Sequence, residues 1–236
     1  RLLTHEETLW GGDDILQLCP INRTTSPGFP WSMICKNGKR DIIMARDESP
    51  PIYYNRFMDK VDELIETCRS GVIPFVLFVV AYKDEALPIE KVLKGKQRII
   101  NTGPIEYTYV FRKYFGEFMS HISKHNIINN ISLGMSDKVF DVDRLKRFIT
   151  SLDDCDYGDG DYSSFEASMS SINSDQMVNF INRWYNQNEV DLESNTIRIC
   201  LWKAITRPYF LFKGNIIEAN GGNSSGNPGT ALRNNL

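Results

Sequence analysis

The sequence lacks the signatures of several common protein classes. Its five cysteines include no Cys-x-x-Cys pair, which argues against a structural zinc site or a disulfide framework and favours reduced thiols in a cytosolic compartment. The net charge of -3 argues against a simple DNA-coating protein, but it does not exclude a local basic groove that binds nucleic acid. The longest apolar run, VIPFVLFVVAY at 72–82, is too short to span a bilayer and contains a proline, and it predicts a buried strand.

The glycine motifs that bind nucleotides are also missing. No Gly-x-Gly-x-x-Gly occurs, and although Gly221 and Gly226 have P-loop spacing, Asn227 and Pro228 follow where Lys and Ser or Thr are needed. The Gly-rich stretch NGGNSSGNPGTALRNN, residues 220–235, therefore predicts either a flexible hairpin or a loop whose backbone N–H groups approach a substrate. In both cases it runs into the start of a helix.

The chain has enough apolar residues, 42% of the total, to bury a core. Apolar periodicity predicts helices over 55–70, 111–125, 138–150 and 173–186. In the third of these, Val139, Val142, Leu145 and Ile149 are expected to face inward. Strand-like segments between the helices place the chain in the α+β or α/β class.

The acidic stretch DYGDGDYSSFEASMS, residues 156–170, places Asp156, Asp159, Asp161 and Glu166 close together. Such acids repel one another unless water or a cation lies between them. A calcium loop matches the second half of the pattern, but Cys155 stands where an oxygen ligand is required. An acidic cluster is usually a solvated turn before a helix. The alternative is a metal site for phosphoryl transfer with a carboxylate at a strand end, for which a single aspartate is weak evidence.

The basic segment holds Lys91, Lys94, Lys96 and Arg98 with no acid among them. This pattern is typical of an exposed hairpin, and it is also typical of a strip that neutralises phosphates.

Taken in order, four stretches resemble the RNA-dependent RNA polymerases of picornavirus-like positive-strand RNA viruses. They are TTSPGFPW (24–31), KDE (83–85) followed by KVLKGKQRII, GDYSSFEASM, and SSGNPGTALRNN. The first is similar to the fingers signature T-S-x-G-Y-P and the second to the basic fingers motif. The third is similar to the palm motif D-Y-x-x-[FY]-D and the fourth to S-G-x-x-x-T-x-x-x-N.

The resemblance implies an α+β right-hand polymerase fold with fingers and an incomplete palm, the thumb being absent. It divides the chain into fingers (1–118), first part of the palm (119–197), fingers insertion (198–214) and a further part of the palm (215–236). The implied activity is RNA-templated RNA synthesis with two Mg²⁺ ions, or Mn²⁺, in viral genome replication. The implied partners are an RNA template and primer, nucleoside triphosphates and a protein primer. The implied location is the host cytoplasm at membrane-associated replication complexes, with no membrane anchor in this chain.

The same resemblance implies roles for individual residues. Asp161 would be the catalytic metal ligand at the end of a palm strand. The triphosphate and ribose would be bound by Lys83, Lys91, Arg98, Glu166, Ser225, Thr230 and Asn234. The template strand would pass Thr25, Ser26, Pro27 and Gly28.

Two departures from the family pattern stand out. Glu166 replaces the usual aspartate, and no Gly-Asp-Asp follows the Gly-rich stretch, whereas GGDD at 11–14 predicts a turn or helix start. We therefore expect an internal fragment that is inactive alone. A reverse transcriptase and a non-catalytic RNA-binding module are the rival interpretations.

Overall fold

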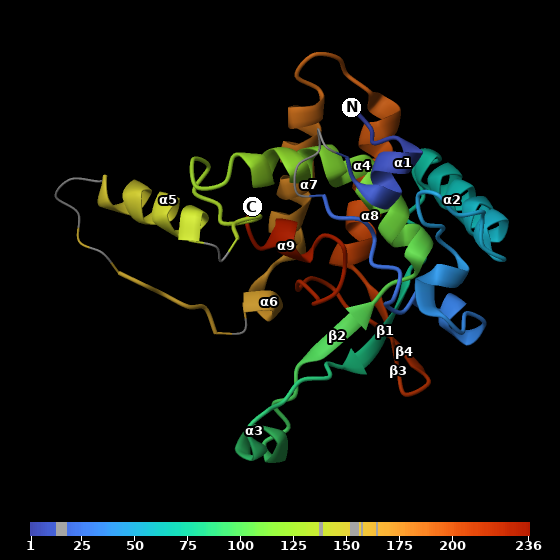
Figure 1. Cartoon of the computed structure of the whole chain (residues 1–236), viewed down its shortest axis with the longest axis horizontal. Helices are drawn as coiled ribbons and strands as arrows, with labels where there is room; N and C mark the ends of the chain where they lie inside the picture. The colour runs from blue at the N-terminus through green and yellow to red at the C-terminus, as the bar shows by residue number, and fades with distance from the viewer. Residues whose placement is uncertain (13–17, 137–138, 152–155, 157, 164) are drawn as a thin grey trace.

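The structure, a computed structural model, describes residues 1–12, 18–136, 139–151, 156, 158–163 and 165–236. Helices lie over one end of a small sheet, and a long β-hairpin extends away from them (Figure 1). The helices are α1 (His5–Trp10), α2 (Tyr54–Arg69), α3 (Ile89–Leu93), α4 (Ile105–Lys124), α5 (Val139–Thr150), α6 (Phe165–Ser168), α7 (Ser171–Tyr185), α8 (Leu192–Thr206) and α9 (Thr230–Arg233), with short 3₁₀ helices η1 (Trp31–Met33) and η2 (Gly38–Asp41). The strands are β1 (Leu77–Tyr82), β2 (Ile99–Thr102), β3 (Tyr209–Phe212) and β4 (Asn215–Glu218). The mixture confirms the α+β expectation.

The four strands form one sheet in the order β2-β1-β3-β4. β1 is antiparallel to β2 and parallel to β3, while β3 and β4 form an antiparallel pair. The prediction of a buried strand over 72–82 is only partly right, because the strand begins at Leu77 and Val72, Phe75 and Tyr82 are exposed. A strand is buried throughout only where other elements cover both faces of its sheet, and in β1 only Phe78 is fully covered.

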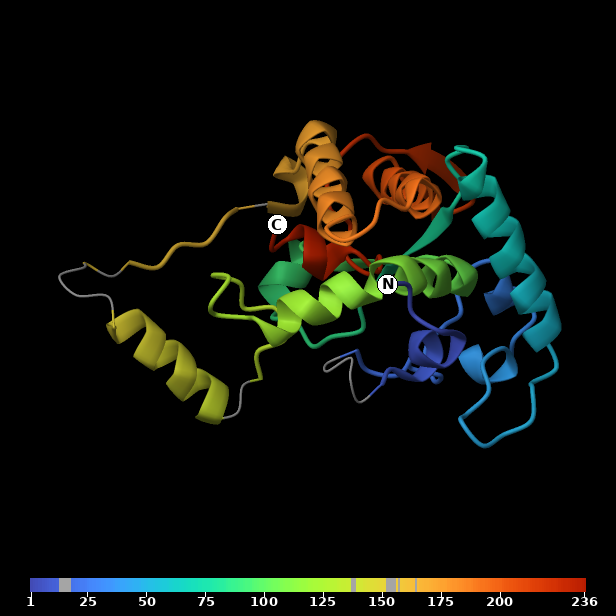
Figure 2. The same ribbon diagram turned by 90° about the horizontal axis from the view of Figure 1, so that it is seen from above.

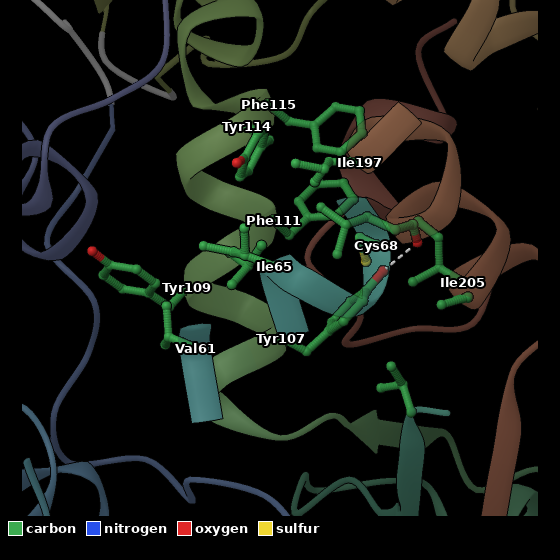
Figure 3. Close-up of a cluster of buried hydrophobic side chains, with 14 of the residues drawn as sticks. Val61, Ile65, Cys68, Tyr107, Tyr109, Phe111, Tyr114, Phe115, Ile197 and Ile205 are labelled. Carbon is green, nitrogen blue, oxygen red and sulfur yellow. Dashed lines mark hydrogen bonds between the residues drawn. The ribbon is translucent and has the colours of Figure 1, made fainter. Parts of the chain in front are cut away.

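The core forms around α4, which packs against α1, α2, α7 and α8. Figure 3 shows aromatic side chains of α4 facing apolar side chains of α2 and α8, with the Tyr107 hydroxyl directed toward α8. That hydroxyl donates a hydrogen bond to the Leu201 carbonyl oxygen at 2.6 Å, so the one polar atom of a fully buried ring is satisfied. The helix predicted over 111–125 buries Phe111, Phe115, Phe118 and Ile122, and it begins at Ile105, directly after Pro104 and earlier than predicted.

Helix α5 forms where the apolar period predicts a helix, but its apolar face is not buried. Val139 is 85% exposed and Phe140 is 75% exposed, and both views show α5 standing away from the other helices (Figures 1 and 2). The expectation that Val139, Val142 and Ile149 face inward is therefore wrong for this chain. An amphipathic pattern specifies a face that needs a partner, and no element in the described ranges covers this one.

The GGDD stretch begins at the end of a helix. Gly11 is the C-cap of α1, with a positive φ of 70° and its N–H bonded to the Glu7 carbonyl oxygen at 2.9 Å. Asp13 and Asp14 lie outside the described residues. Within the described ranges, the cysteines are free thiols and no helix combines the length and apolar character needed to cross a membrane.

Candidate active site

One short segment contacts three of the four motifs found in the sequence. This segment, residues 99–107, comprises β2 and the first turn of α4 and is called the hub segment here. The Asn101 N–H donates to the Ser225 carbonyl oxygen at 2.8 Å, which joins the strand after the basic segment to the Gly-rich loop. At the other end, the indole N–H of Trp31, which follows the fingers signature, donates to the Glu106 carboxylate at 2.6 Å. The fold thus gathers motifs that are far apart in the sequence.

The basic segment forms a hairpin whose base is closed by backbone and ionic contacts. The Lys83 N–H donates to the Arg98 carbonyl oxygen at 2.9 Å. The Glu85 carboxylate lies between the two side chains, 3.1 Å from Lys83 Nζ and 3.2 Å from Arg98 Nη1. By contrast, Lys91 lies on α3 at the far tip of the hairpin (Figure 1), so the structure does not bring it beside Lys83 and Arg98.

Glu85 was missed by the sequence reasoning, which assigned roles only to the cations. Its side chain is 20% exposed, and its Oε1 atom is buried without a hydrogen-bond partner among the described residues. The signal was present in KDE at 83–85, because residues two apart in an extended chain share one side. A carboxylate there can hold both cations in place.

The Gly-rich loop is fixed by its own hydrogen bonds and by a close approach to β2. The Thr230 hydroxyl donates to the Ser224 carbonyl oxygen at 2.7 Å, and α9 starts at Thr230, where a helix start was predicted. Gly226 has a φ of 93°, and a Cβ there would lie 2.7 Å from the Asn101 carbonyl oxygen. Only glycine therefore allows the loop to lie this close to the hub segment.

A buried asparagine joins the acidic stretch to the Gly-rich loop. The Asn223 N–H donates to the Glu166 carbonyl oxygen at 2.6 Å, and Asn223 Nδ2 donates to Asn234 Oδ1 at 2.6 Å. Two residues predicted to contact the ribose, Glu166 and Asn234, are thus held by one side chain and its backbone. The sequence reasoning missed Asn223, because an asparagine in a Gly-rich stretch has the pattern of an ordinary turn residue.

Arg233 is a second buried residue that the sequence did not reveal. It is 1% exposed, and its guanidinium donates to the Gly222 carbonyl oxygen at 2.8 Å. Burial lowers the pKa of Arg233 to about 10, so the group stays charged at neutral pH. A charged side chain inside a four-residue helix has no periodic signal that would predict its burial.

Asp161 is exposed, and its backbone is irregular rather than the strand end that was expected. A strand forms only where a neighbouring strand pairs with its N–H and C=O groups, and no described strand lies beside Asp161. Within the described ranges, no group of three potential metal-ligating side chains occurs. Mg²⁺ binds through one or two carboxylates together with waters and phosphates, so exposed Asp161 fits one ligand position and does not complete a two-ion site.

The fingers signature divides into an exposed half and a buried half. Thr25 and Ser26 are exposed, whereas Pro27 and Gly28 are buried. Gly28 has a φ of 76°, and a Cβ there would lie 2.2 Å from the Gly103 carbonyl oxygen. Pro27 and Gly28 therefore place the loop against the hub segment, and of the four residues only Thr25 and Ser26 are exposed to solvent.

Comparisons with known proteins agree with this geometry. The family model described as "Viral RNA-dependent RNA polymerase" matches residues 14–236. The chain belongs to the viral RNA-dependent RNA polymerase family. The replicase polyprotein of Drosophila C virus (strain EB) is 31% identical over 99% of this chain, and that of Acute bee paralysis virus (strain Rothamsted) is 28% identical over 98%. The chain spans 14% and 12% of the length of these two relatives.

A solved Sicinivirus 3Dpol RNA-dependent RNA polymerase shares the fold. The two structures match with a TM-score of 0.67 at 21% sequence identity, over 99% of this chain and 46% of the solved one. This viral polymerase-family chain thus has part of the right-hand polymerase fold, as the resemblance of its motifs implied.

Proposed function

We propose that this chain forms the nucleotide-binding and template-facing part of an enzyme that copies RNA from an RNA template. The observation that carries the proposal is that the basic hairpin and the Gly-rich loop meet at the hub segment, while Asn223 of the Gly-rich loop bonds both Glu166 of the acidic stretch and Asn234. Two relatives of this chain are replicase polyproteins, which supports the same conclusion. The reaction is attack of an RNA 3′-hydroxyl on the α-phosphate of a nucleoside triphosphate, with release of pyrophosphate.

Lys83 and Arg98 bind the triphosphate in this proposal, and Lys91 joins them if the hairpin tip bends toward the site. The planar guanidinium of Arg98 suits a contact with two phosphate oxygens. Negative charge moves toward the leaving pyrophosphate during the reaction, so fixed cations at that position stabilise the transition state more than the ground state. Glu85 keeps the two cations at the base of the hairpin before the triphosphate arrives.

Asp161 is the residue that would hold Mg²⁺, or Mn²⁺ in its place, on the acidic stretch. When bound there, the ion would stabilise charge on the attacking and leaving oxygens. The ribose is recognised by residues of the Gly-rich loop and of the acidic stretch bonded to it, namely Ser225, Thr230, Asn234 and Glu166. The ribose 2′-hydroxyl distinguishes RNA from DNA. The longer side chain of Glu166 reaches farther than the family's usual aspartate, at a higher cost in side-chain entropy.

The remaining partners complete the proposal. The RNA template passes the exposed Thr25 and Ser26, and the RNA primer, or a protein primer, supplies the attacking hydroxyl. We place the intact enzyme in replication complexes at membranes of the host cytoplasm.

The proposal is tested by primer extension with the intact polymerase that contains these residues. Asp161→Asn removes the carboxylate charge and keeps the shape of the side chain, so templated nucleotide incorporation should fall by orders of magnitude while the melting temperature is unchanged. Asp159→Asn, on the same exposed stretch, is the matched control and should retain activity. Near-normal turnover by Asp161→Asn would remove Asp161 from the metal site.

The 236-residue chain itself should not incorporate nucleotides. Among the residues described, no group of three potential metal-ligating side chains occurs, at Asp161 or elsewhere. Templated incorporation by the purified chain, lost again on Asp161→Asn, would contradict this expectation.

A further inference from the structure

Arg233, the last residue of α9, is buried and donates hydrogen bonds to two backbone carbonyl oxygens and one side-chain amide oxygen. Its guanidinium donates to the Ile205 carbonyl oxygen at 3.3 Å, to the Gly222 carbonyl oxygen at 2.8 Å and to Asn223 Oδ1 at 3.1 Å. No carboxylate pairs with Arg233 in the part of the chain that the structure describes. A guanidinium has five donors and no acceptor, so the Asn223 atom that faces it must be the amide oxygen.

This contact fixes the orientation of the Asn223 amide. With Oδ1 toward Arg233, Nδ2 points the other way and donates to the Thr230 carbonyl oxygen at 3.0 Å and to Asn234 Oδ1 at 2.6 Å. A backbone carbonyl can only accept, so Thr230 independently requires the same orientation. Asn223 is 2% exposed. If its amide were reversed, Nδ2 would face the Arg233 donors and Oδ1 would face the Thr230 carbonyl oxygen, so neither buried atom would have a hydrogen bond.

The orientation of Asn223 in turn determines that of Asn234. Because Asn223 presents a donor, Asn234 must turn its oxygen inward, which directs its two N–H donors away from the loop interior. Asn234 is exposed, so these donors face solvent. Asn223 also bonds the Glu166 carbonyl oxygen through its N–H at 2.6 Å, and Glu166 is an acceptor when ionised.

We propose that Arg233 and Asn223 are positioning residues that hold the Asn234 amide with its N–H donors toward the nucleotide, so that the site recognises the ribose 2′-hydroxyl as a hydrogen-bond acceptor. This inference rests on the proposed function. The 2′-hydroxyl then accepts from Asn234 and can donate to Glu166, and a deoxyribose offers neither interaction. The relay runs through three side chains, and only the last one touches the substrate.

The test measures how strongly the intact polymerase prefers a ribonucleotide over the matching deoxyribonucleotide, as a ratio of kcat/KM values in primer extension. Arg233→Met removes the donors that orient Asn223 and should lower this ratio about tenfold or more. Arg233→Lys keeps a cation and donors and should restore most of the preference. A purely structural defect would lower both kcat/KM values together and leave their ratio unchanged.

A second variant tests the outward donor directly. Asn234→Asp can still accept from Asn223, but it presents an oxygen instead of N–H groups to the ribose, so the ratio should fall about tenfold or more. Asn235→Asp adds the same charge one residue away and is the matched control, because Asn235 bonds the Ala231 carbonyl oxygen. The control should keep the wild-type ratio.

The outcomes separate the relay from the proposed function. If the wild-type polymerase does not extend an RNA primer on an RNA template, the proposed function fails and the relay fails with it. If the wild type is active and selective but Arg233→Met keeps the ratio, the relay is overturned while the function stands. If Arg233→Met does not fold, an unchanged ratio in Asn234→Asp overturns the relay on its own.

Discussion

Glu85 shows how a single carboxylate can prepare a cationic site. It lies within ion-pair distance of both Lys83 and Arg98, whose own side chains are exposed and would otherwise be mobile. Holding them reduces the ordering that triphosphate binding would require. We expect Glu85→Ala in the intact polymerase to lower kcat/KM for nucleoside triphosphates about tenfold, measured by primer extension.

Glu90→Ala provides the matched control for this prediction. Glu90 is an exposed glutamate on α3 of the same hairpin, and it forms no ion pair within the described residues. Its loss changes the net charge equally, so its kcat/KM should stay near the wild-type value. Equal losses in both variants would show that net charge, rather than positioning by Glu85, sets the rate.

The free energy of unfolding should depend on pH through the ionisation of Glu106. Burial raises the pKa of the Glu106 carboxyl above its ordinary value of 4.5, although it accepts the Trp31 indole N–H. The folded chain therefore binds this proton more tightly than the unfolded chain does. The free energy of unfolding must then fall as pH rises from the ordinary pKa through the raised one.

Glu106→Gln should remove that loss of stability. Glutamine cannot ionise, and its amide oxygen can still accept from Trp31. We expect the variant to match the wild type near about pH 4 and to be more stable near about pH 7, as measured by urea unfolding of the 236-residue chain. Glu90→Gln, at an exposed site on α3, should show no such difference. A wild-type advantage at neutral pH would mean that the charged form is the stabilising one.

Single residues were predictable from sequence where a motif fixes their neighbours. Ser225, Thr230 and Asn234 lie on one loop and helix start, so their spacing alone placed them together. Asn223 and Arg233 were not predictable, because a buried polar side chain depends on which groups of other elements surround it. Ile205 and Glu166, which supply two of those groups, lie far from the loop in sequence.

Among the elements, the loop that carries the fingers signature, residues 24–31, depends on one glycine for its position. Gly28 combines a φ of 76° with a position where a Cβ would lie 2.2 Å from a backbone oxygen of the hub segment. We expect Gly28→Ala to lower the free energy of unfolding by about 3 kcal/mol or more, because it adds a backbone clash to the strain of a left-handed conformation. Urea unfolding of the 236-residue chain measures this loss.

Gly71→Ala separates the two contributions. Gly71 follows α2 with a φ of 79°, but a Cβ there would meet nothing within 4 Å. Its substitution should cost only about 1 kcal/mol, the strain alone. Similar losses at both positions would show that the contact with Gly103 does not constrain the loop.

Helices were predictable where their apolar face meets a partner in this chain. The prediction of 55–70 agrees closely with α2, since Phe57, Val61, Ile65 and Cys68 are all buried. The palm strand expected at Asp161 was not found, because strand formation depends on a partner strand rather than on local pattern. Helix α7 begins at Ser171, two residues before the predicted start at 173, because Ser170 caps it and its side-chain oxygen accepts the Asn173 N–H at 3.1 Å.

At the scale of the whole molecule, the apolar face of α5 is exposed in this chain, and we expect it to be covered in a longer polymerase chain. The solved polymerase that shares this fold is about twice as long as the region matched here, since the match covers 46% of it. Val139 and Phe140 are highly exposed, and a single helix with an exposed apolar face gains little stability from local hydrogen bonds alone. We infer that the rest of the polymerase covers this face in the intact enzyme.

Hydrogen exchange measured on the 236-residue chain and on the intact polymerase tests this inference. Amides of α5 should exchange rapidly in the 236-residue chain and at least about tenfold more slowly in the intact enzyme, because covering the apolar face raises the free energy of local opening. Helix α4, already buried against four other helices, is the internal control and should be protected in both. If α5 exchanges equally fast in both proteins, its apolar face has no partner within the polymerase.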